Sequence, residues 1–131
     1  MAVNKTSLSA GEIIRAILTS SEEVTRRVTK IFPVVEASAE LPYITYRRTQ
    51  FESIPTKSTH HVADTVSIEV LCYTAKYTEG VELAEAVRNV LDGAQKEGDD
   101  ICMRSCSLVA GEEAWQNDAY IQQLEFSVKI Y

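Results

Sequence analysis

The side chains best suited to chemistry are two histidines and three cysteines, and their spacing does not form a recognisable site. His60 and His61 are adjacent, so on a strand they point to opposite faces and do not bind one metal ion together. Cys72, Cys102 and Cys106 lack the spacing that zinc ligands usually have. We therefore expect no metal site and no cofactor.

A nucleophilic site needs a base held near a serine or cysteine, and the sequence offers one arrangement of this kind. Cys72 would be the nucleophile, His60 the base and Asp64 the orienting carboxylate. The commoner role of such cysteines is as small buried apolar residues. We therefore expect no catalytic residue. An enzyme that uses Cys72 or His60 remains a third hypothesis for the function, after the two given below.

The cysteines are also poor candidates for disulfides, because an odd number without a secretion signal argues against a disulfide framework. If Cys102 and Cys106 lie on one strand, four steps separate them by about 13 Å, too far for a bridge. The five glycines are too scattered for a phosphate-binding loop. Nucleotide binding is therefore not expected.

Length and charge limit the remaining classes. A chain of 131 residues has the size of a single domain, and we expect one domain over residues 1–131. A net charge of −6 disfavours binding to DNA and to acidic membrane surfaces. Because no run of about 18 apolar residues occurs, we expect no membrane association and a protein that stays in the cytoplasm where it was made.

Two helices and a short helical turn follow from capping patterns and apolar spacing. Ser9 and Glu12 form a capping box before a helix over 10–18, and Ser20 with Glu23 opens a short second turn. Thr78 is expected to cap a helix over 79–92 that ends at Gly93.

Alternation of apolar and polar residues predicts the strands. They are expected over 34–37, 42–46, 65–73, 101–110 and 123–130, with a turn over 111–118. Val66, Ile68, Val70 and Cys72 should share one face of the third strand. This order predicts an α+β fold, an antiparallel sheet of four to five strands with both helices packed on one face.

The segment over 47–62 is polar and lies between two strong strand signals, so it is either a long hairpin or a mobile loop. It holds the basic pair Arg47–Arg48, and the aromatic residues Tyr46 and Phe51 lie nearby in the sequence. Its simplest interpretation is a solvated hairpin, followed by a protein interface and then by a nucleic-acid contact. The candidate interface residues are Tyr46, Arg47, Arg48, Phe51, His60 and His61.

Five segments of the sequence stand out by their order and spacing: Leu41–Tyr46, Val66–Val70, Leu83–Val87, Val90–Gly93 and Gln123–Val128. Together they resemble the phage tail completion family, whose members are also called tail terminator or head–tail joining proteins. The resemblance extends from about Ile31 to the C-terminus, and it carries no catalytic signature.

The resemblance implies a structural subunit of a phage or prophage, without catalytic activity, that forms a ring, commonly a hexamer. The ring would cap the tail tube and join it to the head connector, so the protein would reside in the virion after synthesis in the bacterial cytoplasm. DNA would pass through the ring without stable binding. The alternative is a small ligand-binding or regulatory α+β domain that acts as a dimer, which an apolar pocket with convergent polar groups would favour.

Overall fold

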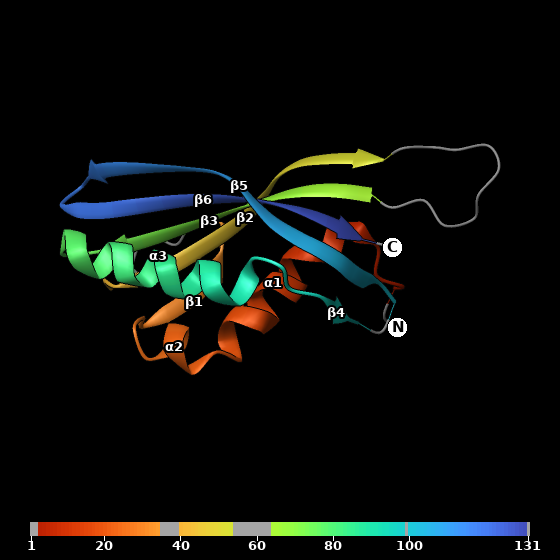
Figure 1. Ribbon diagram of the computed structural model, residues 1–131, viewed down its shortest axis with the longest axis horizontal. Helices are drawn as coiled ribbons and strands as arrows, with labels where there is room; N and C mark the ends of the chain where they lie inside the picture. The colour runs from red at the N-terminus through yellow and green to blue at the C-terminus, as the bar shows by residue number, and fades with distance from the viewer. Residues whose placement is uncertain (1–2, 35–39, 54–63, 99, 131) are drawn as a thin grey trace.

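A mixed β-sheet forms the body of the protein (Figure 1). The computed structural model describes residues 3–34, 40–53, 64–98 and 100–130. Within these residues the sheet has six strands, in the order β1-β2-β3-β6-β5-β4. The strands are β1 (Lys30–Pro33), β2 (Tyr43–Ser53), β3 (Asp64–Thr74), β4 (Lys96–Glu97), β5 (Cys102–Gln116) and β6 (Ala119–Ile130). β1 runs parallel to β2, and every other neighbouring pair is antiparallel.

The predicted sheet of four to five antiparallel strands is therefore wrong, and the described part of the chain has a six-stranded mixed sheet curled into a half-barrel. Two short edge strands account for the strand count. β1 has four residues and β4 has two, so neither shows the alternation that reveals a strand in sequence. The curl follows from β5 and β6, which are 15 and 12 residues long and accumulate the right-handed twist of paired strands.

The strand predicted over 34–37 is not observed where the chain is described. Val34 follows β1 with a φ of 61°, in the left-handed region that a strand does not use. Its N–H donates to the carbonyl oxygen of Tyr46 at 2.8 Å, which ends the parallel pairing of β1 with β2. The rest of that predicted strand lies outside the described residues.

Helices α1 (Ala10–Thr19) and α3 (Tyr77–Leu91) pack against the same side of the sheet, with the short α2 (Glu22–Thr25) beside them (Figure 1). A 3₁₀ turn, η1 (Ser7–Ser9), precedes α1. The predicted helices are confirmed, but their predicted side-chain caps are not. Ser9 makes no capping hydrogen bond, and α3 begins after Lys76 rather than Thr78. Gly93 ends α3 with a φ of 84°, as a glycine after a helix commonly does.

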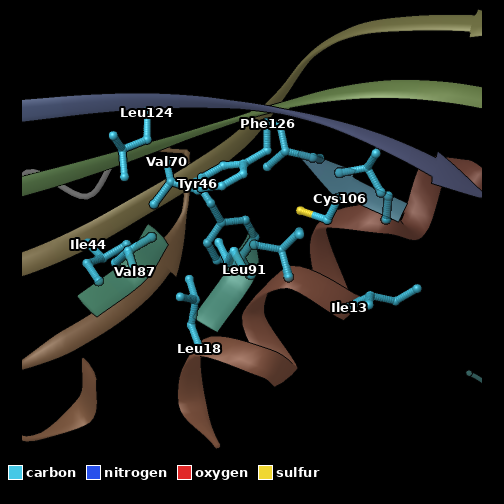
Figure 2. Packing of buried hydrophobic residues seen from close by; sticks show 14 of the residues in the cluster. Ile13, Leu18, Ile44, Tyr46, Val70, Val87, Leu91, Cys106, Leu124 and Phe126 are labelled. Carbon is cyan, nitrogen blue, oxygen red and sulfur yellow. The ribbon is translucent and has the colours of Figure 1, made fainter. Parts of the chain in front are cut away.

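The core lies between the helices and the sheet (Figure 2). The predicted inner face of β3 is confirmed, because Val66, Ile68, Val70 and Cys72 are all completely buried. β6 contributes Phe126, which is also completely buried. Apolar side chains of α1 and α3 close the core from the other side, among them Ile14, Leu18, Leu83, Val87 and Leu91.

The hairpin between β5 and β6 turns later than predicted. β5 continues to Gln116, and the tight turn consists of Asn117 and Asp118, with φ values of 53° and 61°. Two consecutive left-handed residues make the primed turn that suits the twist of a two-residue hairpin, and Asn and Asp tolerate that conformation. The turn predicted over 111–118 is therefore mostly strand.

Candidate functional site

The candidate interface residues divide between the core, the surface and the undescribed part of the chain. Tyr46 is only 7% exposed and packs in the core, with its ring against Gly11 of α1. Burial raises the pKa of the Tyr46 hydroxyl. His60 and His61 lie outside the described residues. Arg47, Arg48 and Phe51 are exposed on the outer part of β2, which continues through the first half of the predicted hairpin segment.

Arg47 belongs to a polar network on the sheet face opposite the helices. Its Nε donates to Oε1 of Glu69 at 3.1 Å, and Gln123 donates to Oε2 of Glu69 at 2.6 Å. Glu69 is 8% exposed, so this carboxylate is nearly buried and both its oxygens are paired. The network joins β2, β3 and β6, and it fixes Arg47 in place.

Arg48 and Phe51 lie on the helix side of β2. Arg48 pairs in register with Ile68 and Phe51 with Val66, and both partners face the core. The guanidinium of Arg48 donates to the carbonyl oxygen of Leu8 in η1 at 3.1 Å. Leu8 is 57% exposed and Phe51 42% exposed. We call Leu8, Arg48 and Phe51 the β2 knob.

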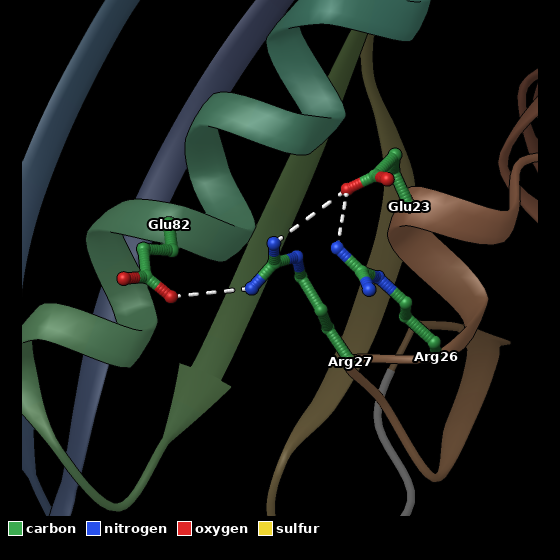
Figure 3. Close-up of polar contacts among 4 residues, drawn as sticks. All are labelled: Glu23, Arg26, Arg27 and Glu82. Carbon is green, nitrogen blue, oxygen red and sulfur yellow. Dashed lines mark hydrogen bonds and ion pairs between the residues drawn. The ribbon is translucent and has the colours of Figure 1, made fainter.

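A groove of about 670 Å³ lies between α2 and α3. Arg27 connects its two walls (Figure 3): its guanidinium lies 3.2 Å from Glu82 on α3 and 3.6 Å from Glu23 on α2. Arg26 also bonds Glu23, at 2.9 Å, and this hydrogen bond lowers the pKa of the Glu23 carboxyl. The groove lining consists of Ser21, Glu23, Arg27, Val81, Glu82, Glu85, Ala86, Asn89 and Val90.

A third surface, which the sequence did not predict, is an aromatic cluster near the β5–β6 turn. Trp115 is 60% exposed, and its ring centroid lies 6.5 Å from that of Tyr120. Tyr77 packs edge-on against Tyr120 at 5.9 Å and donates its hydroxyl hydrogen to Glu113 at 2.6 Å. That bond raises the pKa of Tyr77. An exposed Trp beside Tyr residues is the composition of a protein interface.

The described residues offer little for catalysis. They contain no group of three or more His, Cys, Asp or Glu side chains placed to hold a metal ion. Cys72 and Cys106 are completely buried, and burial raises the pKa of each thiol to about 12. A thiol with such a pKa is protonated at neutral pH and is a weak nucleophile. In the same described ranges, no helix has the length and apolar content to cross a membrane.

Comparison with known proteins identifies the family. The family model of tail completion protein gp17 matches residues 12–128. No curated protein matches the chain. A chain in the virion of a native gene transfer agent particle has a similar fold, with a TM-score of 0.73 and 13% identity over 89% of this chain and 90% of that one. The bacteriophage SPP1 gp17 protein has a TM-score of 0.53 and 17% identity over 92% and 89%. Because the family match covers nearly all of the chain, the protein belongs to the tail completion protein gp17 family, and it is a structural protein of the phage virion that joins tail to head.

Proposed function

We propose that the protein assembles into a closed ring, a hexamer in the simplest case, on the end of the tail tube, and that this ring contacts the head connector. The observation that carries the proposal is the family match over residues 12–128, which runs from within α1 to within β6. The role is assembly without catalysis, which agrees with the buried, protonated thiols of Cys72 and Cys106.

A closed ring requires heterologous contacts, so each subunit must present two different surfaces to its neighbours. The outer part of β2 supplies one of them. Arg47, Arg48 and Phe51 are exposed there, and the candidate interface continues along the chain to His60 and His61. Tyr46 supports this strand from within, because its buried ring packs on α1. The net charge of −6 agrees with a ring that lets DNA pass without holding its phosphates.

The alternative of a ligand-binding dimer has less support. The groove between α2 and α3 is open to solvent, and charged side chains supply much of its lining. An enclosed apolar pocket would be expected for a small-molecule site.

Light scattering and negative-stain microscopy test the ring. The purified protein is measured over a range of micromolar concentrations, alone and with assembled tubes of the tail tube protein. We expect closed rings in solution or at tube ends. A protein that stays monomeric alone and does not bind tube ends would overturn the proposal.

A further inference from the structure

We propose that the groove between α2 and α3 of one subunit receives the β2 knob of the next subunit. This inference rests on the proposed ring and names the two surfaces that close it. The occupant of the groove is therefore a second copy of this chain, and the contact is between two different patches.

Both surfaces carry apolar side chains. The groove is a hollow whose lining includes the apolar side chains of Val81, Ala86 and Val90. The knob consists of Leu8 of η1 with Arg48 and Phe51 of β2, and it carries the ring of Phe51, which is 42% exposed. Placing this ring against the apolar part of the groove would bury apolar surface on both subunits, which favours association.

The charges of the two surfaces are complementary. Three carboxylates line the groove, and its one guanidinium, that of Arg27, is already engaged by Glu23 and Glu82. The third carboxylate, that of Glu85, has no ion pair within the described part of the chain. Arg48 has no carboxylate partner among those residues either, since its guanidinium bonds the carbonyl oxygen of Leu8. We therefore pair Arg48 of one subunit with Glu85 of the next.

Arg48 does not reach the groove of its own subunit, because its guanidinium bonds Leu8 of η1, which does not line the groove. Figure 1 shows that β2 ends, at Ser53, on the far side of the molecule from α2 and the first turns of α3. The outer end of β2 and the α2 wall of the groove therefore lie at opposite ends of the molecule, although both are on the helix side of the sheet. A contact between them repeats from subunit to subunit, and it closes into a ring when the rotation permits.

A charge-exchange experiment tests the pairing of Arg48 with Glu85. The variants are Arg48→Glu, which places like charges in the contact, and Glu85→Arg, which does the same from the groove side. Like charges in an interface oppose association strongly. We expect each variant alone to raise the concentration needed for assembly by at least about tenfold. An equimolar mixture restores opposite charges at every contact, so it should assemble in alternation within about threefold of the wild type.

Controls separate this inference from the ring itself. Lys96→Glu and Glu97→Arg make the same charge changes on the exposed strand β4 and should assemble like the wild type. Circular dichroism verifies that every variant is folded, and tail tubes are included in all measurements. Normal assembly of both single variants, or a mixture that fails to recover, would overturn the pairing while the ring stands. A wild-type protein that forms no ring in either condition would overturn the proposed function instead.

Discussion

Replacing Phe126 by alanine should remove a large part of the protein's stability. The Phe126 side chain is completely buried, and among the residues that the structure describes it is the largest side chain of this kind. In the sheet it pairs with Ile68 on β3 and with Leu108 on β5, at the centre of the face that the helices cover. The substitution therefore leaves a cavity that neighbouring rigid strands cannot close.

The magnitude follows from the size of the lost side chain and the immobility of its surroundings. Burying a Phe side chain contributes a transfer free energy, and the cavity adds to the loss, so Phe→Ala changes in cores cost about 3–5 kcal/mol. The total free energy of unfolding of a domain is about 5–15 kcal/mol. Phe126→Ala should thus lower the urea midpoint by about 2 M, with little change in the slope.

Trp115 supplies a matched control, since it is also a large aromatic residue on the same hairpin but is 60% exposed. Trp115→Ala should cost less than about 1 kcal/mol, because its main loss is the edge-on contact with Tyr120. Urea unfolding followed by far-UV circular dichroism measures both variants. Several protein concentrations are needed, because assembly raises apparent stability. A loss below about 1 kcal/mol for Phe126→Ala would refute the placement of its ring in the core.

Two further predictions concern the thiols and the hairpin turn. At pH 8 a thiol reagent should label only Cys102 in the native protein and all three cysteines after unfolding, because Cys72 and Cys106 are buried with pKa values raised to about 12; fast native labelling of a second cysteine would contradict this. Since those folded pKa values exceed the ordinary value of 9.0, the thiols' contribution to stability is complete below pH 9 and falls as the pH rises towards 12. Asp118→Gly should stabilise the protein by about 0.5–1 kcal/mol in urea unfolding, because glycine adopts the φ of 61° at this position without strain. Asp118→Val should destabilise the protein. Equal stability of the two variants would contradict the left-handed conformation of this turn residue.

The sequence predicted the elements whose own residues determine their structure. Strict alternation placed the buried face of β3 and of β6 correctly, because a half-buried strand must alternate in this way. The apolar stripe of α1 and the glycine after α3 located the helices for similar local reasons.

The missed features depend on partners distant in the sequence. β4 is only Lys96 and Glu97, and it is a strand because these residues pair with Met103 and Cys102. β5 extends through polar residues to Gln116 because β6 satisfies its backbone groups along its whole length. The aromatic cluster joins Tyr77 from α3 to Trp115 and Tyr120 from the β5–β6 hairpin, so no local pattern in the sequence predicts it.

In the candidate interface, the local sequence also fails to predict which face of β2 each side chain occupies. A regular strand would place Arg48 and Phe51 on opposite faces, since they are an odd number of residues apart. The register shift between Arg48 and Gln50 removes one step, and both side chains then project on the helix side of β2. Arg47 precedes the shift and stays on the other face, bound to Glu69. The bulge therefore leaves the two adjacent arginines, both exposed, on opposite faces of β2. Arg47 is bound to Glu69, whereas Arg48, among the described residues, bonds only a backbone carbonyl oxygen, and for this reason the proposed contact uses Arg48.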